Sequence, residues 1–166
     1  IMSKNNKTLL IFFAIICLQT CVILSPDWLK INGITPCWPV VWLLPFSLNY
    51  PPLISVFTAI ILGFFMDSFT IGIISYIPSL FLLSLFWSRY AMHNKNINLL
   101  FNIGLMAIFG AAFVGLSIWI QKIILYENLR NNWFNSWAIY ALISEIIITG
   151  LVAPLFSSWL LLTYKK

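Results

Sequence analysis

Charged residues are scarce in this sequence: Asp, Glu, Lys and Arg together make up 8% of its 166 residues. Soluble globular domains carry about 25% charged residues, so this chain lacks the polar side chains that a water-exposed surface needs. Hydrophobic residues make up 61% of it, and the mean hydropathy is +0.98. The composition therefore excludes an ordinary soluble domain and predicts a single integral membrane domain over residues 1–166.

Recognisable catalytic, metal-binding and nucleic-acid-binding patterns are also missing. No Ser/His/Asp or Cys/His arrangement, P-loop or HExxH motif is present. The three cysteines, Cys17, Cys21 and Cys37, have no CxxC or Cys/His spacing, and His93 stands alone in a polar segment. The net charge of +5 comes without a basic run, which does not favour nucleic acid as a partner. We therefore expect a protein that is not an enzyme and that holds no cofactor and no metal ion.

Apolar runs of membrane-spanning character are what the sequence has instead. A helix needs about 20 residues to cross the hydrocarbon core, with a range of about 17–25. The double proline Pro51-Pro52 divides one run that is too long for a single span. We expect the first helix to be a retained signal anchor and Pro78 to kink the fourth. The fold class predicted is an all-α, polytopic six-helix transmembrane bundle, with helices near residues 8–24, 36–49, 52–66, 71–88, 99–121 and 135–162.

The distribution of cations predicts how these helices are oriented. With six spans and both termini in the cytoplasm, the inside segments hold six cations, Lys4, Lys7, Arg89, Lys95, Lys165 and Lys166. The outside segments hold three, Lys30, Lys122 and Arg130. An excess of Lys and Arg on the cytoplasmic side is the usual rule for membrane proteins. The sequence thus predicts a multi-pass protein with cytoplasmic termini.

Two carboxylates are candidate functional residues. Asp67 lies between two apolar runs, and we interpret it as a cap on the next helix or on the turn before it, or as a carboxylate facing a partner or a substrate. Glu145 lies well inside the last apolar run, where an ionisable residue is costly and is a functional candidate by default. A proton relay, a ligand contact, a hydrogen-bonded strut between helices and a contact to a second protein all stay open for Glu145.

Small residues recur every four positions in the fifth apolar run, at Ala107, Ala111 and Gly115. Such a face lets two helices approach closely. Packing inside the bundle is the favoured interpretation, and a contact between copies of the chain is the alternative.

The order of features along residues 36–90 resembles the bacterial rod shape-determining protein MreD family. A Pro- and Trp-rich segment, PCWPVVWLLPFSLN, leads into ILGFFMD and then IGIISYIPSLFLL, in which Gly63, Asp67 and Gly72 match the family pattern. The use of isoleucine and asparagine is closer to cyanobacterial members. Helices outside this region match mainly in hydropathy.

This resemblance implies a non-enzymatic scaffold of the cell-elongation machinery in the bacterial plasma (inner) membrane. The implied partners are an MreC-like single-span protein, a RodA-type polymerase with its transpeptidase and, indirectly, the actin-like MreB. The alternative is the substrate-binding S component of an energy-coupling-factor vitamin transporter. Those proteins are also small six-helix bundles, with a fold similar to that expected for MreD. The first helix here lacks their Ala-x-x-x-Ala pattern, which disfavours the alternative.

Overall fold

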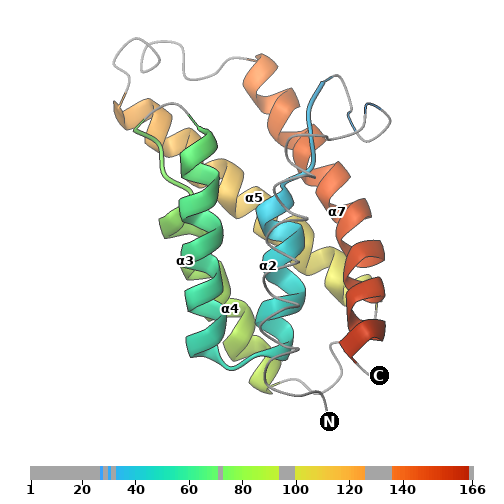
Figure 1. Ribbon diagram of the computed structural model, residues 1–166. Coiled ribbons are helices and arrows are strands. Elements are labelled where there is room, and N and C mark those ends of the chain that lie inside the picture. Colours follow the sequence, from blue (N-terminus) through green and yellow to red (C-terminus); the bar gives the residue numbers. More distant parts are fainter. Residues whose placement is uncertain are drawn as a thin grey trace.

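The computed structural model describes residues 27, 30, 33–70, 73–93, 100–125 and 136–164, without the side chains of 100 and 159–164. This part of the chain is all-helical, with five helices and no strand. Figure 1 shows them as one bundle. The helices are α2 (Trp38–Asn49), α3 (Pro52–Phe69), α4 (Ile77–His93), α5 (Leu100–Leu125) and α7 (Ser136–Tyr164).

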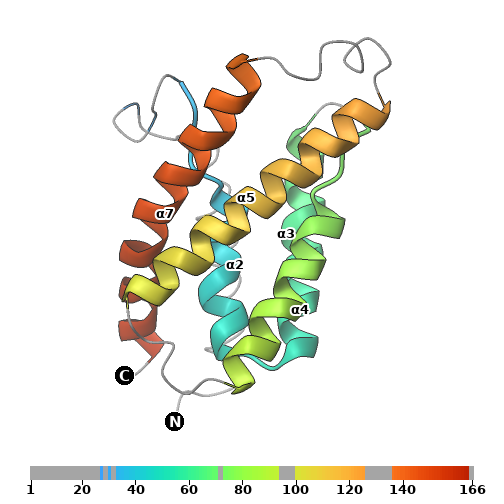
Figure 2. The same cartoon turned by 180° about the vertical axis from the view of Figure 1, so that it is seen from behind.

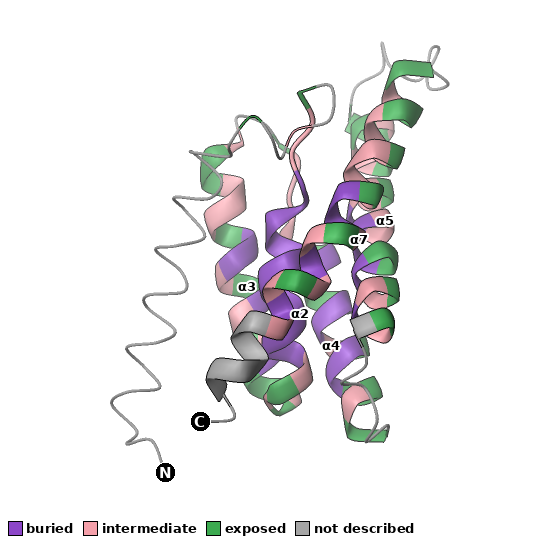
Figure 3. Cartoon of the chain, turned by 90° about the vertical axis from the view of Figure 1, so that its right-hand side faces the viewer, coloured by how far each residue is buried: buried purple, intermediate pink, exposed green. Residues whose placement is uncertain are grey.

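Helix α2 forms the centre of the bundle. Its sequence, WPVVWLLPFSLN, is apolar on nearly every side, and ten of its 12 residues are buried. A helix that is hydrophobic all round needs neighbours all round, and α2 contacts α3, α4, α5 and α7. Figure 3 shows the buried residues gathered on α2 and on the faces turned toward it. The core of the protein is therefore a short helix wrapped by four longer ones.

Successive helices run in opposite directions through the bundle (Figures 1 and 2). The ends of α3 and α5 and the start of α7 therefore lie toward one end, which we call the Asp67 end, and α2 and α4 run away from it. The opposite end holds the turn between α2 and α3 and the last residue of α4, His93, and we call it the His93 end. Helices α5 and α7 pack closely toward the His93 end and diverge toward the Asp67 end.

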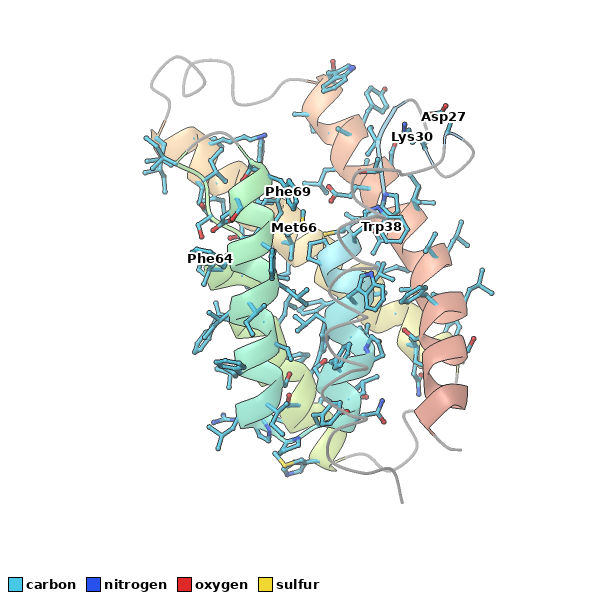
Figure 4. All side chains as sticks on the ribbon, in the orientation of Figure 1. Asp27, Lys30, Trp38, Phe64, Met66 and Phe69 are labelled. Carbon is cyan, nitrogen blue, oxygen red and sulfur yellow. The ribbon has the colours of Figure 1, made fainter. Side chains whose placement is uncertain are left out.

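Among the described residues, three helices have the length and composition to cross a membrane: Pro52–Phe69, Phe101–Leu125 and Ser136–Ser158. Their outward faces carry large exposed apolar side chains, such as Phe64 on α3 and Leu155 on α7. Figure 4 shows Phe64 pointing away from the bundle. These features fit a protein whose solvent is a bilayer. Helix α2 has 12 residues, and at about 1.5 Å per residue it extends only about 18 Å, well short of a hydrocarbon core about 30 Å thick.

The predicted helices correspond to the observed ones with one clear error. The predicted helix over 71–88 begins at Ile77 instead and continues to His93, so His93 ends a helix and does not lie in a loop. Pro78 is the second residue of α4, so the predicted kink there is wrong. Proline is favoured in the first turn because the missing N–H has no helical partner at that position. The predicted helix over 8–24 lies outside the described residues.

Candidate functional site

Asp67 connects the last turn of α3 to the segment that precedes α4. Its Oδ1 accepts a hydrogen bond from the backbone N–H of Tyr76 at 2.7 Å, and its Oδ2 accepts one from Ser75 Oγ at 2.6 Å. Ser75 Oγ in turn accepts from the N–H of Ile77, the first residue of α4, at 3.2 Å. Asp67 therefore caps the segment that starts α4, which is the capping geometry expected from the sequence.

Gln121 of α5 joins the same network from the other side. Its Oε1 accepts from the Ser75 backbone N–H at 2.9 Å, and its Nε2 donates to the Ser75 carbonyl at 3.0 Å. One side-chain amide thus satisfies both backbone groups of a residue that lies outside any helix. The two contacts hold the segment before α4 between α3 and α5. Gln121 is not among the residues predicted from the sequence, although an uncharged polar residue in a long apolar run could have indicated such a contact.

Glu145 of α7 lies against the start of α2. Its carboxyl group lies close to the Cys37 side chain. One turn further along, Thr149 Oγ1 accepts from the Cys37 backbone N–H at 2.9 Å and donates to the Glu145 carbonyl at 2.6 Å. Cys37 and Thr149 are both buried. Residues from both ends of the described chain therefore form one polar cluster that attaches α7 to the central helix.

A pocket of about 260 Å³ opens beside Glu145, at the Asp67 end, where α5 and α7 diverge. Its walls include Tyr76 from the segment before α4, Trp119 and Lys122 from α5, and Trp137 from α7. Burial raises the pKa of the Tyr76 phenol above its usual value, so this group stays a neutral hydrogen-bond donor. Tyr76 belongs to both sites, because its backbone N–H binds Asp67 while its side chain lines the pocket.

Most of the other residues singled out from the sequence act in helix packing. A Cβ on Gly63 would lie 2.9 Å from Ile77 Cα, so α3 meets the start of α4 backbone to backbone at that point. Ala107 and Ala111 are buried in the core, as the packing interpretation of their face requires. A Cβ on Gly115 would lie 3.4 Å from Leu142 Cγ of α7, an ordinary contact distance. Gly72 lies outside the described residues.

A second close approach was not expected from the sequence. A Cβ on Gly150 of α7 would lie 2.5 Å from Ile108 Cγ1 of α5. A Cβ on Gly110 would lie 2.5 Å from the Trp87 ring of α4. Glycine at both positions is therefore part of how α5 packs against its neighbours on either side.

Ahead of α2, Asp27 and Lys30 form an exposed ion pair with a separation of 2.7 Å between Oδ1 and Nζ (Figure 4). The hydrogen bond from Lys30 holds the pKa of Asp27 below its usual value. Such exposed pairs contribute little to stability. This pair has no contact with either polar cluster among the hydrogen bonds of the described residues.

Comparison with protein-family models, curated proteins and solved structures finds no match for this chain. In the described part of the chain, no group of three or more His, Cys, Asp or Glu side chains is arranged to hold a metal ion. The Asp67 end supplies hydrogen-bonding and charged side chains. Its two centres are the Asp67 network and the pocket beside Glu145.

Proposed function

We propose that this chain is a non-enzymatic membrane scaffold of a bacterial cell-elongation machinery, similar to MreD. It spans the plasma membrane several times with both termini in the cytoplasm. It helps to position peptidoglycan synthesis through contacts with an MreC-like single-span protein and a RodA-type polymerase with its transpeptidase. It acts on its neighbours by contact and transforms no substrate.

The observation that carries this proposal is the structural role of the residues that carry the resemblance. Gly63 permits the close approach of α3 to Ile77, and Asp67 holds the segment that follows through Tyr76 and Ser75. Both residues therefore fix the shape of the junction between α3 and α4. A G-x-x-x-D pattern that fixes a helix junction suits a protein that acts by presenting a fixed surface to its partners.

The outward faces of α3, α5 and α7 supply such surfaces. Phe57 and Phe64 are exposed on α3, as are Leu105 and Ile124 on α5. In a bilayer, helices associate through close packing and interhelical hydrogen bonds, because lipid tails are as apolar as the side chains. Exposed aromatic and branched side chains in rows are therefore compatible both with lipid and with a partner's membrane helix.

Photo-crosslinking in the native membrane tests this proposal. A photoreactive residue replaces Phe64, which is 65% exposed, and in a matched control it replaces the buried Leu43. We expect the first variant to crosslink to a single-span MreC-like protein and the second to crosslink within the chain. Depletion of the protein should also disturb rod shape or cell-size control. A cell that keeps normal shape on depletion, with no elongation protein among the crosslinks, would contradict the proposal.

The S component of a vitamin transporter is a second candidate, and the pocket beside Glu145 is the observation that favours it. This candidate predicts that a vitamin and a transporter's energy-coupling subunits are recovered with the purified chain. Their recovery in stoichiometric amounts, with normal cell shape on depletion, would replace the scaffold with the transporter.

A further inference from the structure

The pocket between α5 and α7 lies where the ends of two membrane-type helices separate. Lys122 is three residues from the end of α5, and Trp137 is the second residue of α7. Glu145 is nine residues into α7, which places it about 14 Å along the helix axis from Ser136. The pocket therefore extends from the level of the helix ends, where Trp and Lys side chains are typical of the membrane interface, toward the interior.

Glu145 has hydrogen-bonding capacity beyond its contact with Cys37. A carboxylate offers about four lone-pair positions, whereas a thiol is a weak donor that occupies one of them. Glu145 lines a pocket to which Tyr76 and Lys122 also contribute polar side chains. A strong cationic donor placed there would satisfy the carboxylate far better than the thiol does.

Lys122 provides the opposite charge without neutralising Glu145 directly. The two side chains line the same pocket and interact electrostatically. Within the described residues, however, the only ion pair is Lys30–Asp27. Lys122 is exposed at the pocket rim, and Glu145 is partly buried deeper in the pocket. A carboxyl group inside and a cationic side chain at the rim, with space between them, give the pocket two polar ends of different chemistry.

We propose that this pocket binds a small zwitterionic group, with its primary ammonium at Glu145 and its anionic part at Lys122. Trp119 and Trp137 are among the apolar lining residues beside these two polar ends. Two sources supply this chemistry: the headgroup of phosphatidylethanolamine entering between α5 and α7, and a free molecule such as phosphoethanolamine. The inference goes beyond the scaffold function and does not rest on it.

Lipid retention by the full-length protein tests the first source. The chain is purified from an equal mixture of dioleoylphosphatidylethanolamine and dioleoylphosphatidylcholine, which differ only in methylation of the ammonium group, and bound lipid is counted by native mass spectrometry. The second source is tested by titrating phosphoethanolamine, against phosphocholine, into the protein in phosphatidylcholine nanodiscs. The variants are Glu145→Gln and Lys122→Gln, and Arg89→Gln, an exposed cation on α4 away from the pocket lining, is the matched control.

We expect the primary amine to be preferred over its methylated counterpart by about tenfold in at least one of the two assays, since a charge-assisted hydrogen bond contributes that much. Glu145→Gln and Lys122→Gln should each remove most of that preference, and Arg89→Gln should leave it unchanged. Preference in the lipid assay alone identifies a headgroup, and preference in the titration identifies a free ligand.

Equal retention and equal titration of the two headgroups by the unmodified protein would overturn the proposal. So would a Lys122→Gln variant that binds as the unmodified chain does. Circular dichroism reports whether Glu145→Gln folds. If it does not, Lys122→Gln decides, because the Lys122 side chain is exposed and substitutions at exposed positions usually change stability very little. None of these outcomes depends on cell shape, so they are separable from the test of the scaffold function.

Discussion

At the scale of single residues, Asp67 shows how a carboxylate in an apolar chain can serve structure. Its two oxygens accept from different groups, the Tyr76 N–H and the Ser75 hydroxyl. Asparagine keeps one acceptor oxygen, and alanine keeps none. Because hydrogen bonds to charged groups contribute about 1.5–3 kcal/mol, we expect Asp67→Asn to lower the free energy of unfolding by about 1–2 kcal/mol and Asp67→Ala to lower it further. Equilibrium unfolding in detergent micelles measures both.

Ser68 supplies the control for this prediction. Its hydroxyl donates to the Phe64 carbonyl within α3 and is exposed, so Ser68→Ala should change stability by less than about 0.5 kcal/mol. If Asp67→Ala were as stable as the unmodified chain, the network at the start of α4 would not contribute to folding. If Asp67→Asn were as damaging as Asp67→Ala, the charge itself, and not the cap, would be what matters.

The sequence predicts a role for Asp67 but leaves several roles open for Glu145, and the reason is physical. The partners of Asp67 follow it by only eight and nine residues, in the segment that leads into the next helix, so a role at that turn could be predicted from its place in the sequence. Thr149 meets Cys37 across 112 residues, and no local pattern encodes that meeting. The rarity of acids in apolar helices marked Glu145 as important, but only the fold shows that Cys37 and Lys122 are near it.

At the scale of helices, two glycines separate the effect of helix propensity from that of packing. Alanine is favoured over glycine in a helix by about 1 kcal/mol. At Gly115 the new Cβ would lie 3.4 Å from Leu142 Cγ, so Gly115→Ala should be neutral or slightly stabilising. At Gly63 it would lie 2.9 Å from Ile77 Cα, which is backbone and cannot turn away. We expect Gly63→Ala to destabilise by about 1–3 kcal/mol, as measured by thermal unfolding of the two variants side by side.

The essential result is that Gly63→Ala lowers the stability of the protein, whereas Gly115→Ala does not. A Gly63→Ala variant at least as stable as the unmodified chain would mean that α3 and the start of α4 can separate without loss. A Gly115→Ala variant that unfolds early would mean that the space for a Cβ beside Leu142 is smaller than the 3.4 Å separation indicates.

Helix existence was more predictable than helix boundaries. The apolar runs of α3, α5 and α7 and the Pro51-Pro52 break are strong local signals, and these helices occur where they were expected. The start of α4 was placed at residue 71 because the segment IGIISY is as apolar as a helix. Within that segment, the Ser75 N–H binds Gln121 and the Tyr76 N–H binds Asp67 ahead of α4, and these tertiary contacts override hydropathy. Pro78 then falls in the first turn, where proline is compatible with a helix.

At the scale of the whole molecule, α2 is the feature that hydropathy describes least well. Val40, Val41, Leu43 and Leu44 are fully buried by protein, so the apolar character of α2 reflects burial among helices as much as exposure to lipid. Hydropathy cannot separate these two environments, because both select apolar side chains. The membrane character of the protein was predictable from composition, whereas the central position of a 12-residue helix was not.

The number and direction of membrane crossings give the final prediction. Helices α3 and α4 run in opposite directions, so Ser68 at the Asp67 end and Met92 at the His93 end lie on opposite sides of the bundle, and both are exposed. The cation distribution predicts that the Asp67 end faces outward. With Cys17 and Cys21 replaced by alanine and Cys37 retained because it is 4% exposed, cysteine is introduced at one of the two positions. A membrane-impermeant maleimide should label Ser68→Cys in intact cells and Met92→Cys only after permeabilisation.

The reverse pattern would mean that the orientation in the membrane is inverted. Labelling of both positions from outside would mean that α3 and α4 do not cross as a pair. Either result would remove the topological basis of the scaffold proposal, since its cytoplasmic and external partners would then meet the wrong ends of the bundle.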